Sequence, residues 1–417
     1  MRHLDATMVQ GLLPWPAAVE AARSTAEAVA AGAVHQADRI WHQPDGMPGQ
    51  IGIMPSYLPD DGQDPAVFVT KVVGVFPTAD PSVNGVLVVL DGATGAPLVT
   101  LDVSAVTARR TAAASALSVD LLAREDASSM AVIGAGAQGR AHLEAICAVR
   151  DVVEVRVWNR TQGRAEALVE HARAELGISR VAVAGTPAAA ADGADIVSVC
   201  TNSPTALLGA SDIADGAHVT AIGAFSPDTR ELAADLIAAG RVFVDDRAAA
   251  AHEAGDILMA IEAGVVDDGV VVADLAELVT DTVTLGPAGG RPTVYKSVGT
   301  SAMDAVAVRH LLRAEAATRL AVYGTLAPGG TNEAVLRPFG GRWTAGTVRG
   351  RRLDDGWNGY PGLTLEGTEP VHVDLLEAPS IDWNLIDHFE GPGYVRRRVI
   401  VRTEKEEAVL ANTYVLA

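Results

Sequence analysis

The middle of the chain alternates short apolar runs with segments in which apolar residues recur every three or four positions. Between about Met130 and Asp246 the apolar runs are MAVIGAG, VEVRVWN, VAVAG, DIVSVC, HVTAIGA and RVFVDD, and helical segments such as RAEALVEHARAEL and TRELAADLIAAG separate them. Strict alternation of β-branched strands with helices is typical of βαβ units. It predicts an α/β domain with a parallel sheet over residues 119–295.

The flanking segments have a different pattern. In residues 1–118, Pro and Gly interrupt strand-like runs such as VFVTKVVGVF and GVLVVL, which indicates a separate α+β layer. The stretch SAMDAVAVRHLLRAEAATRL predicts one amphipathic helix, and residues 296–316 are assigned to that same layer. From about Leu320 the chain is rich in Gly and Arg with short strands and turns, so residues 320–417 are predicted to form another small domain.

Composition narrows the class of protein. A chain of 417 residues is too long to fold around one hydrophobic core, so more than one domain is expected. Its formal net charge of -20 argues against nucleic acid or an anionic membrane as partners. Cys147 and Cys200 are expected to be free thiols in a reducing compartment, and no metal site is indicated. The N-terminal MRHLDATMVQGLL lacks a signal-peptide pattern, and no apolar run reaches membrane-spanning length, so we expect a cytoplasmic enzyme.

A glycine motif joins the run MAVI to the helical segment RAHLEAICAVR. G-x-G-x-x-G between a strand and a helix of a βαβ unit is typical of dinucleotide-binding turns, in which the helix N-terminus faces the pyrophosphate. The glycines permit a tight turn, close approach of the ligand and close packing of the helix. We predict cofactor binding at Gly134, Gly136, Ala137, Gln138 and Gly139; the alternative is a turn without a ligand.

The second predicted strand ends in Trp158-Asn159-Arg160-Thr161. Domains that bind NAD have an acidic residue here, which accepts hydrogen bonds from the ribose hydroxyls. Asn159 has no charge to repel a 2′-phosphate, and Arg160 offers a planar donor group for one. The sequence therefore predicts NADPH, with Asn159, Arg160 and Thr161 as cofactor-binding residues. In the alternative, Arg160 is an exposed side chain with no role.

The first layer contains three cations that stand out by their context. Arg39 lies in ADRIWHQPDG, ahead of a Met-Pro pair in GIMPSY, and Arg110 lies in TARRTAAAS. Taken singly, each could be a solvated surface charge. Lys71, however, interrupts VFVTKVVGVF, which otherwise reads as a buried strand, and a buried lysine requires a partner or a ligand.

Together with the glycine motif, these segments resemble the ornithine cyclodeaminase/mu-crystallin family over residues 1–315. The Arg before Met-Pro, the Lys, RTAAAS, VIGAGAQGRAHL and VYKSVGTSAMD occur in the family's order. The resemblance implies that Arg39, Lys71 and Arg110 hold the carboxylate of an amino or imino acid beside the nicotinamide, and that Thr111 contacts the cofactor. It also implies a homodimer joined through the first layer, with the segment 297–315 packing back on it.

The turn after HVTAIGA carries Phe225. Cyclodeaminases of the family have an Asp at this position, which acts when the side-chain amine attacks the imine carbon. A phenyl ring cannot do acid–base chemistry. The stretch GAFSPDTREL is instead similar to the branch that reduces cyclic ketimines such as pyrroline-2-carboxylate and piperideine-2-carboxylate, which implies that Phe225 contacts an aliphatic ring. In the alternative, Phe225 only packs, and Asp228 replaces the missing acid.

The expected reaction is hydride transfer from NADPH to the carbon of a C=N bond. A protonated imine carbon is electrophilic, and a carboxylate clamp would present one of its faces to the cofactor. Lys71 is the nearest candidate to manage the proton, directly or through water.

The C-terminal segment resembles the gamma-glutamyl cyclotransferase family of the type that acts on gamma-glutamylamines. A strand opening with Tyr323-Gly324-Thr325-Leu326 and the later DHFEGPGYVRR carry the resemblance. It implies a small mixed β-barrel in which the Tyr323–Leu326 turn binds the glutamyl carboxylate and Glu390 is the acid–base. In the alternative, Glu390 caps a turn in a non-catalytic interaction module. The run Arg396-Arg397-Arg398 is interpreted mainly as strand surface.

Three functions follow from these patterns. The first is a bifunctional enzyme that combines NADPH-dependent ketimine reduction with removal of a gamma-glutamyl group from an amine and release of 5-oxoproline. The second is an ornithine cyclodeaminase-type lyase, against which Phe225, Asn159 and Arg160 argue. The third is a mu-crystallin-like protein that binds nucleotide and ligand without turnover, which the set of three cations makes less favoured.

Overall fold

The structure is a computed structural model that describes residues 1–76, 78–79, 83–286 and 289–417. The chain forms two compact units: one comprises Met1–Leu13, Val34–Ala105 and Val308–Ala417, and the other Pro14–Ala33 and Val106–Ala307. The predicted domains 1–118 plus 296–316 and 119–295 divide the chain differently, because α2 (Trp15–Ala30) and most of α3 (Val103–Leu122) belong to the unit of the parallel sheet.

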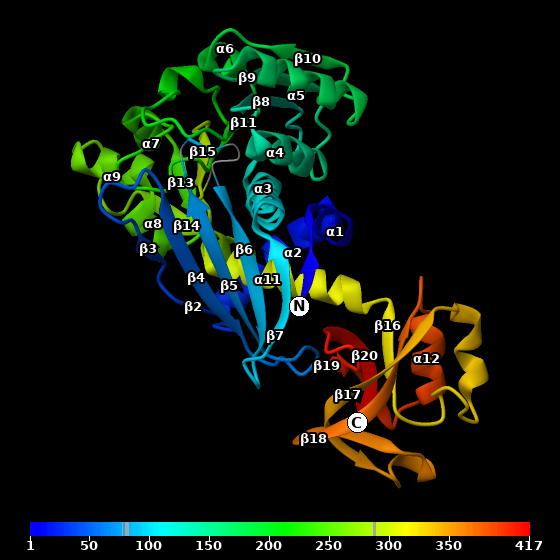
Figure 1. The fold of residues 1–417 in the computed structure, drawn as a ribbon. Helices are drawn as coiled ribbons and strands as arrows, with labels where there is room; N and C mark the ends of the chain where they lie inside the picture. The colour runs from blue at the N-terminus through cyan, green and yellow to red at the C-terminus, as the bar shows by residue number, and fades with distance from the viewer. Residues whose placement is uncertain (77, 80–82, 287–288) are drawn as a thin grey trace. The chain divides into compact units, whose positions relative to one another are not determined.

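The second unit is built on an eight-stranded parallel sheet of order β10-β9-β8-β11-β12-β15-β13-β14 (Figure 1). Its strands are β8 (Ser129–Ile133), β9 (Glu154–Trp158), β10 (Arg180–Val183), β11 (Ile196–Val199), β12 (His218–Ala221), β13 (Arg241–Val244), β14 (Val271–Asp274) and β15 (Thr293–Lys296). The six predicted strands are confirmed. β14 and β15 were not predicted from the pattern.

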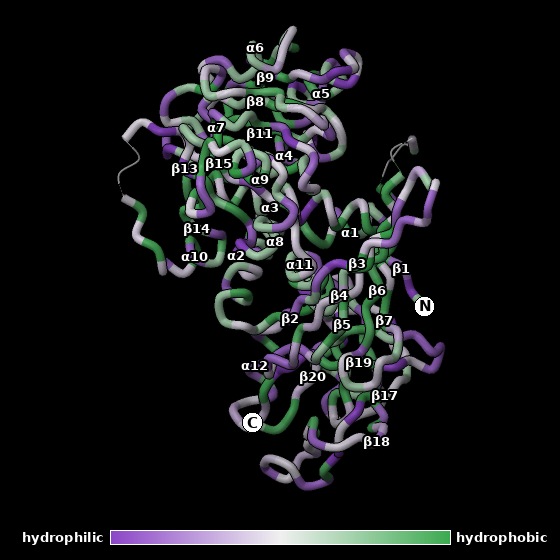
Figure 2. The backbone as a smooth tube through the Cα atoms, turned by 90° about the vertical axis from the view of Figure 1, so that its left-hand side faces the viewer, coloured by the Kyte–Doolittle hydropathy of each residue, from purple (hydrophilic) through white to green (hydrophobic). Residues whose placement is uncertain are grey.

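Helices alternate with these strands, as the sequence predicts. They are α4 (Ala137–Cys147), α5 (Gln162–Ala174), α6 (Pro187–Ala191), α7 (Ala234–Ala239), α8 (Arg247–Glu253), α9 (Gly255–Glu262) and α10 (Leu275–Val279). Burial is almost complete in the central strands β8, β11, β12, β13 and β15, and Figure 2 shows this part of the sheet largely in green. The strands β9, β10 and β14 are less buried. The sheet is therefore the core of this unit, with its carboxyl ends available for ligands.

The first unit contains a seven-stranded, mostly antiparallel sheet of order β1-β7-β6-β5-β4-β2, with β3 paired to β4. Its strands are β1 (Arg2–Leu4), β2 (His35–Gln36), β3 (Ile40–His42), β4 (Gln50–Leu58), β5 (Val67–Val75), β6 (Val83–Asp91) and β7 (Pro97–Asp102). Burial alternates along the strands, so that Met54, Lys71 and Leu87 lie side by side on the buried face. α1 (Ala6–Leu12) joins this unit, and α11 (Ser301–Ala316) contributes to both units.

The C-terminal segment closes into a barrel of order β16-β18-β17-β19-β20, which confirms the predicted mixed β-barrel. Its elements are β16 (Arg319–Val322), β17 (Arg342–Leu353), β18 (Gly362–Glu377), α12 (Trp383–Glu390), β19 (Tyr394–Thr403) and β20 (Ala408–Leu416). β16 pairs antiparallel with β18 and parallel with β20. Tyr323–Leu326 follows β16 as a turn, so the prediction that this motif opens a strand was wrong.

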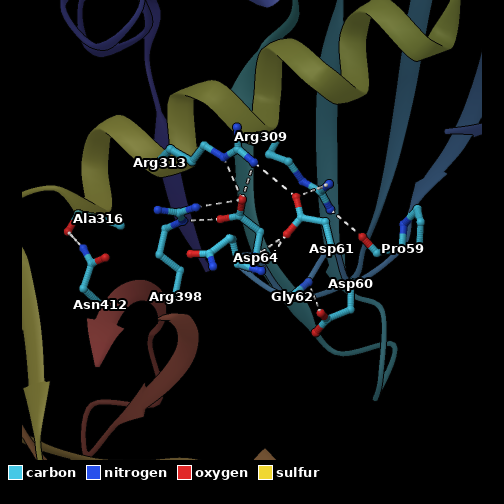
Figure 3. Close-up of polar contacts among 11 residues, drawn as sticks. Pro59, Asp60, Asp61, Gly62, Asp64, Arg309, Arg313, Ala316, Arg398 and Asn412 are labelled. Atoms are coloured by element: carbon cyan, nitrogen blue, oxygen red, sulfur yellow. Dashed lines mark hydrogen bonds and ion pairs between the residues drawn. The ribbon is translucent and has the colours of Figure 1, made fainter. Parts of the chain in front are cut away.

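Arg398 of β19 binds the turn between β4 and β5, as Figure 3 shows. Asp64 in this turn is 3% exposed and accepts hydrogen bonds from Arg398 of β19 (Nη2–Oδ2, 3.1 Å) and from Arg313 of α11 (Nε–Oδ2, 2.6 Å). Asn412 of β20 also donates to the carbonyl oxygen of Ala316 at the end of α11 (2.8 Å). The interpretation of Arg398 as strand surface was therefore wrong, because it pairs with a buried carboxylate.

None of the helices in the described ranges is both long enough and apolar enough to cross a membrane.

Candidate active sites

The glycine motif forms a tight turn between β8 and α4. Gly134 has a φ of +102°, and a side chain there would meet the carbonyl oxygen of Cys200 at 2.5 Å. A Cβ on Gly139 would lie 1.9 Å from the carbonyl oxygen of Gly134, so the helix packs too closely for any other residue. At Gly136, the N-cap of α4, a Cβ would meet no atom within 4 Å. This open space at a helix N-terminus fits a dinucleotide pyrophosphate.

Asn159 shapes this turn from the end of β9. Its Oδ1 accepts a hydrogen bond from the N–H of Ala135 (2.9 Å), and its Nδ2 donates to the carbonyl oxygen of Thr161 (2.9 Å). The amide thus ties the glycine turn to the second strand, a role that the sequence did not reveal. Arg160, the next residue, is exposed. The contacts of Arg160 and Thr161 with a cofactor remain predictions.

Arg110 lies in α3 and is only 9% exposed. Its Nε donates to Oδ1 of Asp304 (3.1 Å), and a Cβ on Gly299 would lie 2.4 Å from its Nη1. Asp245 holds the backbone beneath the guanidinium, because its Oδ2 accepts hydrogen bonds from the N–H groups of Val298 (3.0 Å) and Gly299 (2.6 Å). The neighbouring Thr111 is also buried. Arg110 is thus held in a fixed place by the VGTSAMD segment.

Lys71 and Arg39 belong to the other compact unit. Lys71 is 4% exposed on β5, in register with Met54 and Leu87, so the predicted buried lysine is confirmed. Arg39 lies between β2 and β3 and is partly buried. Since Lys71 and Arg110 lie in different units, their shared contact with one substrate carboxylate stays a prediction.

Phe225 lies in the turn that follows β12 and is 38% exposed, which leaves its ring available for a ligand. Asp228 in the same turn is exposed and accepts a hydrogen bond from the hydroxyl of Ser226. Asp228 is thus a solvated side chain of the same turn, at a different position from the ring of Phe225.

A buried carboxylate behind this turn was missed from the sequence. Glu231 accepts hydrogen bonds from the N–H (2.6 Å) and hydroxyl (2.7 Å) of Thr201 through Oε1, and from the N–H of Gly223 (2.6 Å) through Oε2. Burial raises the pKa of Glu231 to about 7, against the opposing charge of Lys296. Lys296 itself pairs with Asp256 (Nζ–Oδ2, 2.8 Å), and both side chains are fully buried.

The barrel encloses a cavity of about 230 Å³. The turn Tyr323–Leu326 forms part of its wall, and Glu390, at the end of α12, is also in the lining. Five further aromatic residues line the cavity: Trp357, Tyr360, Phe389, Tyr394 and Tyr414. The structure therefore brings the two predicted barrel motifs together around one cavity.

Among the described residues that line this cavity, Glu390 supplies the acidic group and none is a lysine or arginine. Burial raises the pKa of Glu390 to about 7. Trp357 lines the same cavity and packs on the backbone that follows Glu390: a Cβ on Gly393 would be 2.1 Å from the indole, and one on Gly391 3.4 Å from it. A carboxyl group of this kind can both accept and donate a proton near neutral pH.

The sequence as a whole matches two family descriptions. Residues 5–319 match the model of the ornithine cyclodeaminase/mu-crystallin family. The chain belongs to this family. Residues 320–417 match the description "Gamma-glutamyl cyclotransferase, AIG2-like", so a domain of that type is fused to the family member.

Relatives of known activity align with the first part. The ketimine reductase mu-crystallin of Mus musculus is 31% identical over 267 residues, which cover 63% of this chain and 79% of the relative. A delta(1)-pyrroline-2-carboxylate reductase of Bacillus cereus is 31% identical over 246 residues, covering 58% of this chain and 75% of the relative.

A solved structure supports the fold. The delta(1)-pyrroline-2-carboxylate reductase of Thermococcus litoralis, in complex with NADH and L-proline, superposes with a TM-score of 0.71 and 28% identity, covering 75% of this chain and 97% of that one. The N-terminal part is thus an imine-reductase-type family member, followed by a gamma-glutamyl cyclotransferase-like barrel.

Two groups of residues in these sites were not predicted. Asp245 and Asp304 fix Arg110, and Glu231 with Asp256 and Lys296 fixes two turns at the carboxyl ends of the parallel sheet. Only the acidic residues within VYKSVGTSAMD and TREL hint at them in the sequence, and acidic residues are most often solvated surface groups.

Proposed function

We propose that the chain is a bifunctional enzyme. Its first part reduces a cyclic ketimine carboxylate of the pyrroline- or piperideine-2-carboxylate type with NADPH, and its barrel removes a gamma-glutamyl group from an amine with release of 5-oxoproline. One observation carries the reductase assignment: Phe225, without any proton to transfer, stands exposed where a cyclodeaminase needs a carboxylate. The similarity to pyrroline-2-carboxylate and ketimine reductases supports the same branch.

In the reductase, the glycine turn and α4 would hold the cofactor's pyrophosphate, and NADPH supplies a hydride equivalent when bound. Arg110, fixed by Asp304, would bind the substrate carboxylate together with Arg39 and Lys71. A fixed cation costs little reorganisation when the substrate binds, and this favours one orientation of the imine. Lys71 would also deliver or retain the imine proton, and Phe225 would contact the aliphatic carbons of the ring.

We also propose that the protein is a homodimer joined through the first layer. One face of the antiparallel sheet exposes Ile51, Ile53 and Phe68, each at least 38% accessible. Contiguous exposed apolar side chains on a regular sheet are typical of a protein interface. The family resemblance assigns the dimer contact to the same layer.

In the barrel, the Tyr323–Leu326 turn would bind the glutamyl carboxylate, and Glu390 would act as the acid–base. The α-amine of the glutamyl group loses a proton to Glu390 as it attacks its own side-chain amide carbon. A new C–N bond closes the five-membered lactam, the original amide C–N bond breaks, and the proton returns to the departing amine. The products are 5-oxoproline and a free amine, with no net gain or loss of protons.

The two reactions form a sequence. A gamma-glutamyl group converts the amine of an amino-keto acid into an amide nitrogen, which is not nucleophilic, so an amino-keto acid carried in this form cannot cyclise. After the barrel frees the amine, intramolecular attack on a ketone four or five carbons away, with loss of water, gives a five- or six-membered imine. The first part would then reduce this imine to a proline- or pipecolate-like product.

A cofactor assay tests the reductase assignment. Purified protein supplied with a preformed cyclic ketimine carboxylate should oxidise NADPH, followed by its absorbance. Ammonia release from ornithine would instead indicate a lyase. Tight NADPH binding without oxidation would indicate a mu-crystallin-like binding protein.

A further inference from the structure

The buried carboxylate of Glu231 joins two turns at the carboxyl ends of the parallel sheet. Thr201 follows β11 and Gly223 follows β12, which are neighbours in the sheet. Glu231 accepts three hydrogen bonds from these two residues, two through Oε1 and one through Oε2. Ligands of parallel α/β sheets bind at such turns.

The Thr201 and Gly223 turns are packed closely against each other. A Cβ on Gly223 would lie 1.6 Å from the carbonyl oxygen of Thr201, and a Cβ on Gly134 would lie 2.9 Å from Cγ2 of Thr201. Thr201 thus touches the glycine turn on one side and the turn that leads to Phe225 on the other. Any shift of Thr201 would therefore displace both the glycine turn and the turn that leads to Phe225.

A second buried pair holds the segment that carries Glu231. Oδ1 of Asp256 in α9 accepts hydrogen bonds from the backbone N–H groups of Glu231 (2.7 Å) and Leu232 (2.8 Å). Its Oδ2 pairs with Lys296 at the end of β15 (2.8 Å). Three buried ionisable groups that form hydrogen bonds and an ion pair at a ligand-binding edge are costly unless they fix a geometry that the function requires.

We propose that Glu231 is a positioning residue for imine reduction. Its carboxylate keeps the Thr201 and Gly223 turns in one arrangement. The position of Phe225 relative to the cofactor-binding glycine turn therefore stays constant. This role rests on the proposed reductase function. It requires both carboxylate oxygens as acceptors, a condition that an amide at this position cannot meet.

Glu231→Gln tests the proposal, because it keeps the shape of the side chain and replaces one acceptor by a donor. Hydrogen exchange of the free protein should become faster at the amides of Thr201 and Gly223, with the strands unchanged. The dissociation constant of NADPH should change by less than about threefold, whereas kcat for a cyclic ketimine should fall about 10- to 100-fold, the cost of a small misplacement. A larger isotope effect with deuterated NADPH should accompany the loss.

Two variants complete the design. Thr201→Val removes the hydroxyl donor and keeps the N–H, so it should lower kcat less than Glu231→Gln while folding normally. Asp267→Asn is the matched control, because Asp267 also accepts a hydrogen bond from a glycine N–H (Gly269, 3.0 Å) in the same unit. It lies in the exposed turn before β14, at the amino end of the parallel strands, whereas the Thr201 and Gly223 turns lie at their carboxyl ends. This control variant should leave kcat unchanged.

Unchanged kcat and unchanged exchange at Thr201 and Gly223 in Glu231→Gln would overturn the proposal. So would faster exchange across the whole sheet together with equal losses in NADPH binding and kcat, which would indicate general destabilisation. A wild-type protein that reduces no ketimine would overturn the proposed function instead, and the exchange measurement would still decide whether Glu231 holds the two turns.

Discussion

Arg160 is exposed at the end of β9, beside the glycine turn that Asn159 stabilises. No carboxylate stands at this strand end to bind ribose hydroxyls, so a 2′-phosphate would meet the guanidinium without repulsion. Arg160→Ala should weaken binding of NADPH by ~1.5 to 3 kcal/mol, the value of a hydrogen bond to a charged group. NADH binding should hardly change. Isothermal titration with both cofactors measures this, and equal kinetic efficiency of the wild type with NADH and NADPH would contradict the prediction.

The raised pKa of Glu390 leads us to expect that the barrel reaction depends on pH. Burial raises its pKa to about 7, and only the ionised form can take the proton of the attacking amine. kcat/KM for 5-oxoproline release should therefore rise as pH increases through about 7. Trp357→Ala exposes the carboxyl to water, so its pKa should fall and this rise should move to lower pH. A pH profile that is the same in both proteins would show that Trp357 does not set the pKa of Glu390.

Single residues were predictable where their chemistry is unusual for their surroundings. Lys71 interrupts an apolar strand and is indeed buried, and the glycines of the cofactor turn have the close contacts that their motif requires. Glu231 and Asp245 were not predictable, because their role depends on backbone groups that are distant in sequence and are brought together only by the sheet. Asn159 was assigned to the cofactor; in the structure its amide oxygen accepts a hydrogen bond from the glycine turn.

In the proposed function, the turn after β12 distinguishes a reductase from a lyase. Phe225→Asp should not create ornithine cyclodeamination, because the lyase also needs a pocket that holds the side-chain amine near the imine carbon. The variant should lose ketimine reduction by about tenfold or more, since a charged group would replace the apolar contact with the ring. Ammonia release from ornithine, measured in parallel with NADPH oxidation, checks both statements. Robust release by the wild type would show that the branch assignment is wrong.

We expect the stability of the protein to depend on the contacts between the β4–β5 turn and the barrel. Asp64 is buried and pairs with Arg313 and Arg398, so Asp64→Asn leaves two guanidinium groups without their carboxylate (Figure 3). The free energy of unfolding should fall by ~3 kcal/mol. Asp354→Asn, at an ion pair whose Asp side chain is 100% exposed, should change it by less than ~0.5 kcal/mol. Equal midpoints of urea unfolding for the two variants would contradict a docked barrel.

At the level of elements, periodicity sufficed for the six central strands and for α11, where β-branched runs or helical spacing are strong. β14 and β15 are as long as the predicted β10–β13, but each follows a segment of Gly, Asp or Pro residues that is typical of turns. The strand and turn around Tyr323–Leu326 were misplaced because the helix predicted over SAMDAVAVRHLLRAEAATRL includes the first residues of β16, whereas α11 ends at Ala316. The arginine run of β19 could not reveal its partner, since Asp64 lies in a distant turn.

At the scale of the whole molecule, the fusion links a gamma-glutamyl cyclotransferase-like barrel to a family member related to imine reductases. The docking contacts of Asp64 and Asn412 join the barrel to the first layer of the same chain. In the proposed function, a spontaneous cyclisation between the two reactions would generate a reactive imine, and the fusion would keep that imine on the same chain as the part that reduces it.

The most direct measurement supplies a gamma-glutamyl-protected amino-keto acid with NADPH and follows 5-oxoproline and NADPH together. The wild type should produce both signals. Glu390→Gln should abolish both while leaving the reduction of a preformed ketimine intact, and Lys71→Ala should spare 5-oxoproline release while slowing NADPH oxidation. If Glu390→Gln leaves 5-oxoproline formation unchanged, Glu390 of the barrel does not release the amine that would become the imine substrate, and the account is contradicted.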